Sequence, residues 1–103
     1  MKFKIGDKVR VKTLEEILED PNTIVMGNRI VTSYFIEENG ELINIHDALV
    51  EDMKKMCGKC FTISQVNKNK HLYILDGDSM YYDWLECWLT EPYCYIDSFL
   101  AIL

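Results

Sequence analysis

The middle of the chain carries the strongest secondary-structure signal. Residues 61–66 and 72–75 alternate apolar with polar side chains, and the polar residues 67–70 between them favour a turn. Alternation with a period of two is typical of strands that bury one face, so the two runs predict an antiparallel hairpin. A second turn at residues 76–78 sends the chain back through residues 80–84. The chain is therefore expected to consist largely of β-structure.

The N-terminal part of the chain predicts a strand followed by a short helix. Residues 3–11 alternate apolar and basic side chains, with a bend at residues 6–7. Thr13 and Glu16 have the spacing of a capping box, and the apolar positions that follow lie on one face of a helix. Pro21 ends this predicted helix.

A further hairpin and a second helix are predicted before the central hairpin. Residues 23–26 and 29–36 are rich in β-branched and aromatic side chains and flank a Gly-Asn turn, and an Asn-Gly turn leads to an apolar run at residues 42–45. Asp47 is expected to cap a helix whose apolar positions continue to Met56. The glycine two residues later suits the left-handed position that stops a helix.

Length and composition fit one small domain. The chain has 103 residues, of which 49% are hydrophobic and 27% are charged, as is ordinary for a globular protein. So short a chain has a small stability margin, and a bound metal ion would add to it. The sequence lacks a run of roughly 20 apolar residues that could span a membrane, and its start lacks the apolar core of a secretory signal. We therefore expect a cytoplasmic protein without membrane association.

The four cysteines predict a metal site. Cys57 and Cys60 have the CxxC spacing with which a tight turn presents two thiolates to one ion. In a reducing cytoplasm, cysteines are free or metal-bound more often than paired in disulfides. The predicted ligands of a structural zinc ion are Cys57, Cys60, Cys87 and Cys94. His46 or His71 could replace one of them, and the alternative interpretation is that the cysteines are small buried apolar residues.

Charge is distributed unevenly along the chain. The net charge is -6, yet the first dozen residues are basic, and beyond Lys70 there are six acidic residues and no lysine or arginine. Such a surface repels phosphates and attracts basic partners, so direct nucleic-acid binding is not expected. Tyrosines within it would add anchoring contacts. The predicted partner-binding residues are Asp76, Asp78, Tyr81, Tyr82, Asp83, Glu86 and Glu91. The alternative is that the acidic residues serve only solubility.

Three segments carry recognisable motifs. Residues 4–11 read KIGDKVRV, residues 58–63 read GKCFTI, and residues 84–89 read WLECWL. These segments resemble the opening KxGDxVxV strand, the GKxxTI strand and the closing turn of small phage and prophage proteins with an SH3-like barrel, which are related to the repeats of Mind bomb proteins. The resemblance covers about half of the chain. The sequence departs from the pattern in its long segment 22–46, in its extra cysteines and in the tail after Pro92.

The resemblance implies an α+β, mostly β fold: a small SH3-like barrel with an inserted hairpin and two short helices. Residues 1–103 form a single domain in this interpretation. The barrel core covers about residues 1–12 and 57–92, the insertion covers about 21–46, and residues 93–103 are an apolar tail that packs on the barrel. Trp84 and Trp88 are expected to fill one end of the barrel.

The resemblance also implies a phage-encoded binding protein. Phage accessory proteins of this size commonly block a host protein. The most specific form of this predicted function is an anti-CRISPR inhibitor. It would dock on a basic surface of a type II CRISPR effector in the host bacterial cytoplasm and block DNA loading or cleavage. The alternatives are an SH3-like module that binds peptides or assembles with itself, and a redox protein that uses Cys57 and Cys60. No residue pattern indicates an enzyme, and a monomer is favoured over a homodimer.

Overall fold

The structure is a computed structural model that describes residues 1–92. The predicted apolar tail at residues 93–103, which includes Cys94, lies outside the described residues. The described part is mostly β-structure with two short α-helices, as the sequence predicts. In chain order its elements are β1 (Lys8–Val11), α1 (Leu14–Glu19), β2 (Thr23–Met26), β3 (Arg29–Glu38), β4 (Glu41–Leu49), α2 (Glu51–Lys54), β5 (Cys60–Asn67), β6 (Leu72–Asp76), β7 (Trp84–Leu85), the 3-10 helix η1 (Glu86–Trp88) and β8 (Leu89–Thr90).

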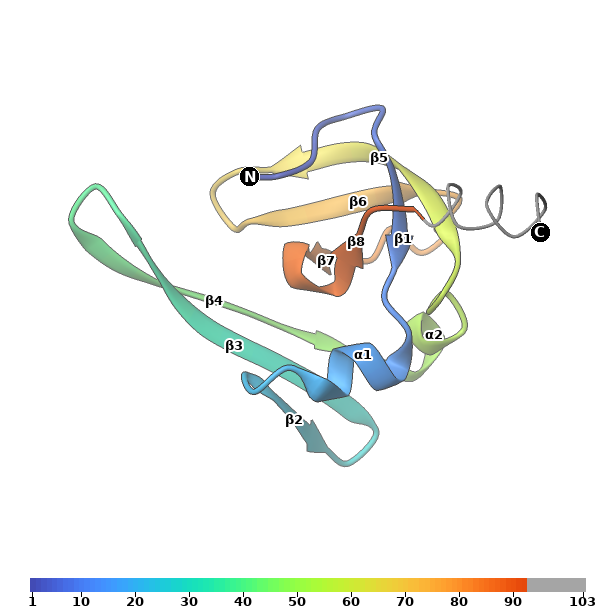
Figure 1. Cartoon of the computed structure of the whole chain (residues 1–103), viewed down its shortest axis with the longest axis horizontal. Helices are drawn as coiled ribbons and strands as arrows, with labels where there is room; N and C mark the ends of the chain where they lie inside the picture. Colours follow the sequence, from blue (N-terminus) through green and yellow to red (C-terminus); the bar gives the residue numbers. More distant parts are fainter. Residues whose placement is uncertain (93–103) are drawn as a thin grey trace, which may run out of the picture.

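Five strands form one antiparallel sheet in the order β7-β6-β5-β1-β8 (Figure 1). β5 and β6 are the central hairpin predicted from the alternating pattern. β1 lies between two strands from much later in the chain, because Val9 pairs with Phe61 of β5 and Val11 pairs with Leu89 of β8. The sheet therefore brings the first and last described strands together.

β2, β3 and β4 form a second antiparallel sheet, which contains the predicted additional hairpin. The pairing of β3 with β4 runs from Ile30 and Leu49 at its base to Glu38 and Glu41 beside the turn. Figure 1 shows the turn end of this hairpin projecting to one side of the five-stranded sheet. Ile30 and Leu49 are buried, whereas the residues around the turn are exposed. We call this hairpin the arm.

Two tryptophans lie in the core that both sheets share. Trp84 and Trp88 are buried, and their rings meet edge to face with centroids 6.2 Å apart. Trp88 Nε1 donates a hydrogen bond to Thr32 Oγ1 at 2.9 Å and so connects η1 to β3 of the second sheet. The two rings are thus buried, and the expectation that they fill one end of a barrel stays a prediction.

The first helix begins at the predicted capping box. Glu16 N donates to Thr13 Oγ1 at 3.2 Å, and Thr13 N donates to Glu16 Oε1 at 3.0 Å. Both terminal nitrogens of Arg10 also donate to the Glu16 carboxylate, at 2.9 and 3.1 Å. These contacts, with that of Arg10 the strongest, lower the pKa of Glu16 to about 2. The Arg10 side chain is 4% exposed, so this pair fixes α1 against β1.

The second helix begins later than predicted. Asp47 does not cap it, because β4 continues through Asp47 to Leu49 and α2 is a single turn, Glu51–Lys54. Thr32 of β3 pairs with Asp47, and Ile30 pairs with Leu49. Pairing with a neighbouring strand thus overrides the helical spacing of these apolar residues. Gly58 has φ of 81°, in agreement with its predicted left-handed conformation.

Candidate functional site

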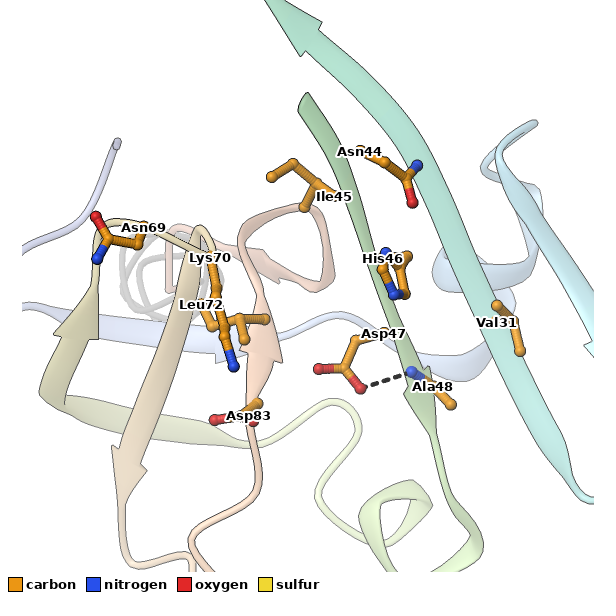
Figure 2. A pocket seen from close by; sticks show the side chains of 10 residues that line it. All are labelled: Val31, Asn44, Ile45, His46, Asp47, Ala48, Asn69, Lys70, Leu72 and Asp83. Carbon is orange, nitrogen blue, oxygen red and sulfur yellow. Dashed lines mark hydrogen bonds between the residues drawn. The ribbon is translucent and has the colours of Figure 1, made fainter. Parts of the chain in front are cut away.

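A hollow of about 560 Å³ lies between β4 and the turn that joins β5 to β6 (Figure 2). β4 is the last strand of its sheet within the described residues, so one of its edges is not covered by another strand of that part of the chain. The facing wall is formed by Asn69, Lys70, Leu72 and Asp83. The hollow is therefore assembled from segments that are distant in the sequence.

Four ionisable side chains line this hollow: Asp47, Asp83, His46 and Lys70. Figure 2 shows the Asp47 and Asp83 carboxylates and the Lys70 amine between the two walls. Asp47 Oδ1 accepts a hydrogen bond from the Ala48 backbone at 2.7 Å. Burial raises the pKa of Asp47, against the opposing effect of the hydrogen bond from Ala48. The negative charge of Asp83 raises it further, and His46 and Lys70 lower it by less. A cation supplied by a binding partner would therefore stabilise the Asp47 carboxylate.

A second hollow, of about 320 Å³, adjoins the first and shares Asp47, Ala48 and Asp83 with it. Tyr81 and Tyr82 line its other side. Tyr81 is 69% exposed, and Tyr82 is half-buried. The structure thus brings three predicted partner-binding residues together with Asp47. We call the surface formed by Asp47, Tyr81, Tyr82 and Asp83 the docking surface.

The loop that carries the tyrosines is built around a buried carboxylate. Asp78 is 5% exposed and accepts hydrogen bonds from the backbone nitrogens of Met80 at 3.2 Å and Tyr82 at 3.0 Å. It also accepts one from Trp84 Nε1 at 3.0 Å. An enclosed carboxylate needs these internal donors, so Asp78 presents little surface to a partner, and its predicted contact with a partner stays a prediction. The loop holds Tyr81 at φ of 53°, with its side chain exposed.

The other predicted acidic residues lie in two different surroundings. Asp76 is exposed and lines a further hollow together with Tyr81. Glu86 instead accepts hydrogen bonds from the Tyr73 hydroxyl and from the Lys2 backbone nitrogen. Glu91 forms an ion pair with the Lys2 side chain at 3.8 Å. The Lys2 ammonium group therefore offsets part of the charge of Glu91, Glu86 is engaged by neutral donors, and only Asp76 is added to the surroundings of the docking surface.

Three of the four predicted zinc ligands belong to the described part of the chain. Cys57 is half-buried after α2, Cys60 is exposed at the start of β5, and Cys87 is half-buried in η1. Within residues 1–92, no group of three or more His, Cys, Asp or Glu side chains is arranged to hold a metal ion. Because Cys94 lies outside these residues, the zinc site stays a prediction.

Two of these thiols have raised pKa values. Burial raises the pKa of Cys57, and burial together with the negative Asp20 raises the pKa of Cys87 to about 11. A raised pKa keeps a thiol protonated and lowers its reactivity. This chemistry gives no support to the alternative in which Cys57 and Cys60 act as a redox pair.

Sequence reasoning missed two residues of the hollows. The sequence pattern predicts Asp47 as a helix cap and Lys70 only as part of a turn. They face one another because β4 passes beside the β5–β6 turn, and the short-range pattern of the sequence carries no signal of that approach. The tyrosines and Asp83 were found because they lie next to one another in an acidic stretch.

No protein-family model matches the chain, and searches of curated proteins and of solved structures find no match. Among residues 1–92, no helix is both long and apolar enough to cross a membrane. The candidate site is thus defined by its own geometry and charge.

Proposed function

We propose that this protein is a binding module that inhibits a basic protein partner through the docking surface. The observation that carries the proposal is the position of the exposed Tyr81 beside a hollow that also holds the carboxylates of Asp47 and Asp83. An aromatic side chain held by a rigid loop supplies contact area at a small entropic cost. The carboxylates supply long-range attraction and orient a basic partner.

The charge of the protein supports a basic partner. The chain has a net charge of -6, and only Asp, Glu and neutral residues follow Lys70. Lys70 and Arg29 line the two hollows, so the docking surface also has positive charges at its margins. The raised pKa of the half-buried Asp47 means that the nearby Lys70 does not fully offset the burial of this carboxylate. A lysine or arginine of the partner fits this position.

For the fold, the proposal is that the five-stranded sheet is an SH3-like barrel. Its strand order supports this interpretation. The KxGDxVxV segment supplies β1, which is hydrogen-bonded both to β5 from the GKxxTI segment and to β8 from the closing segment. The same three segments carry the sequence resemblance to small phage proteins.

The specific form of the proposal is a phage-encoded anti-CRISPR protein. In this form the docking surface contacts a positively charged nucleic-acid channel of a type II CRISPR effector in the bacterial cytoplasm and blocks DNA loading or cleavage. The sequence resemblance and the acidic docking surface support it. A structural zinc ion bound by the cysteines remains part of the proposal.

The test is a titration of the protein into a panel of type II effectors loaded with matched guides. We expect cleavage of target DNA to fall with added protein for at least one effector, and a complex to elute from a sizing column. Tyr81→Ala should weaken this binding by about tenfold or more, because it removes the anchor. Asp83→Lys should slow association, and the effect should shrink at high salt.

The matched control for the charge reversal is Glu19→Lys. Glu19 is exposed at the end of α1 and lines none of the hollows described here, yet its replacement changes the net charge by the same amount. Equal loss of binding in Glu19→Lys and Asp83→Lys would show a general charge effect without a docking surface. Undiminished cleavage and no complex with every effector would exclude the anti-CRISPR form.

The second candidate is an SH3-like binding or self-assembly module without an inhibitor role. The uncovered edge of β4 beside the larger hollow favours it, because an extended peptide can pair with a free strand edge. Binding to a host peptide without any loss of effector activity distinguishes this candidate from the inhibitor.

A further inference from the structure

The sheet of β2, β3 and β4 has one face that packs on the core and one that does not. On β3, the buried Ile30 and Thr32 alternate with residues that point the other way. The opposite face, which we call the outer face, carries Arg29, Val31, Ser33, Phe35 and Glu37 along β3. Cross-strand pairing adds Leu42 opposite Glu37 and Ile24 opposite Val31. The outer face thus extends over all three strands.

Large apolar side chains are exposed on this outer face. The exposed fractions are 57% for Ile24, 58% for Met26, 68% for Phe35 and 74% for Leu42. At the polar centre of the face, Asn44 Nδ2 donates to Ser33 Oγ at 3.0 Å and to the Tyr34 carbonyl at 3.2 Å, and the exposed His46 pairs with Ser33. Covering the apolar part of this face removes apolar surface from water.

The order of side chains along β3 identifies what can cover the face. Arg29 lies at one end and Glu37 at the other, with Val31 and Phe35 between them and Ser33 in the centre. In an antiparallel copy laid face to face, Arg29 meets Glu37 of the other chain. Val31 then meets Phe35, and the small Ser33 lies on the twofold axis. We infer that the outer face is the interface of a homodimer, with a second copy of this chain as its partner.

This geometry is that of an isologous contact, in which the same surface patch serves both chains. Two sheets pack face to face at about 10 Å, with their strands rotated by about 30° because each sheet is twisted. A strand of ten residues offers a face about 33 Å long. β4 has nine residues but β2 only four, so the face is smaller than a typical stable interface of roughly 800 Å² per chain. The expected dimer is therefore reversible, with dissociation in the micromolar range.

The outer face shares Arg29 and Val31 with the hollows of the docking surface, so the test of the dimer needs a residue outside those hollows. Phe35 lines neither of the two hollows of the docking surface. A variant at this position therefore tests the outer face without removing a residue of the docking surface. The sequence alone favoured a monomer because the pairing that places these apolar residues on one face is not visible in it.

The test is sedimentation equilibrium of the full chain over a range of concentrations. The wild-type protein is expected to show a reversible shift from the mass of one chain to that of two. Phe35→Glu should abolish the shift, because it places a charge in the apolar part of the interface. Arg29→Glu and Glu37→Arg should each weaken dimerisation by about tenfold. The double variant Arg29→Glu/Glu37→Arg should restore it, since the pair is then only reversed.

Val25→Glu is the matched control. Val25 is 63% exposed on the same short strand as Ile24, but its side chain points to the other face. Dimerisation that survives Val25→Glu and is restored in the double charge variant supports the face-to-face arrangement. A monomer at every concentration would overturn the inference. So would a dimer that is lost in Val25→Glu and kept in Phe35→Glu, because that result indicates pairing along the edge of β2.

Discussion

One carboxylate, that of Asp78, determines the conformation of the loop that presents Tyr81. Its three hydrogen-bond donors lie within the next six residues, so the short segment that follows Asp78 contains all the groups that hold the loop in this conformation. The same residue illustrates why acidic stretches are ambiguous. Asp76 and Asp83 are exposed, whereas Asp78, between them, is enclosed.

Replacing Asp78 with alanine should destabilise the protein by about 3 kcal/mol. The reason is that the buried Trp84 indole N–H and two backbone N–H groups lose their acceptor. Asp78→Asn keeps one acceptor oxygen and should cost less. Urea unfolding measures both values. An unchanged midpoint for Asp78→Ala, together with weaker partner binding, would contradict this structural role and support the predicted contact of Asp78 with a partner.

Glu16 should make stability depend on pH in the acid range. Its pKa is lowered from 4.5 to about 2, chiefly by Arg10. A lowered pKa stabilises the fold at pH values above 4.5, and this contribution is lost as the pH falls toward 2. Glu16→Gln keeps a side chain that can cap the helix but removes the charge. We therefore expect the free energy of unfolding to fall by about 1 to 3 kcal/mol at pH 7, and this difference should disappear near pH 2.

The measurement for Glu16 is the free energy of unfolding across pH 2 to pH 7, compared between wild type and variant. Glu15→Gln is the control, because Glu15 is exposed in the same helical turn and has no partner among the hydrogen bonds and ion pairs described here. A difference between wild type and Glu16→Gln that stays constant with pH would contradict the explanation.

At the scale of elements, a hydrogen bond to Thr32 ties the two sheets together. Thr32 is fully buried, accepts from Trp88 Nε1 and lies 2.7 Å from the Thr23 hydroxyl. Thr32→Val should lower the stability of the fold by about 1 to 3 kcal/mol, because it leaves the buried indole N–H without an acceptor. Thermal unfolding followed by tryptophan fluorescence measures this loss of stability. Thr23→Val removes only the contact between the two hydroxyls and should lower the stability by less, so equal losses in the two variants would contradict this account.

Elements that depend on nearby residues could be predicted from the sequence. The capping box of α1 and the β5–β6 hairpin each lie within one short segment, and both are as expected. The end of β4 could not be predicted, because Asp47 and Leu49 fit a helix equally well until β3 is placed beside them. The same limit applies to the docking surface. Tyr81 and Asp83 could be proposed from composition, whereas their meeting with Asp47 depends on how the two sheets approach.

At the scale of the whole molecule, the zinc prediction needs the complete chain because it includes Cys94. We expect protein purified without a chelator to contain about one zinc ion per chain and to melt several degrees lower once the metal is removed. Elemental analysis and thermal scans before and after chelation test this. Cys57→Ser and Cys60→Ser should lower the metal content most. Zinc-free protein with the same melting temperature would end the hypothesis.

The position of β1 between β5 and β8 has a consequence for synthesis. The arm pairs residues that are close in sequence, so it can close soon after Leu49 has left the ribosome. Val9 of β1 can pair once Phe61 of β5 has followed, but Val11 must wait for Leu89, which at about 5 to 20 residues per second takes several seconds more. During that interval the edge of β1 that later pairs with β8 is uncovered. Slowing translation between β4 and β8 should therefore lengthen the time for which a chaperone can bind the nascent N-terminal segment.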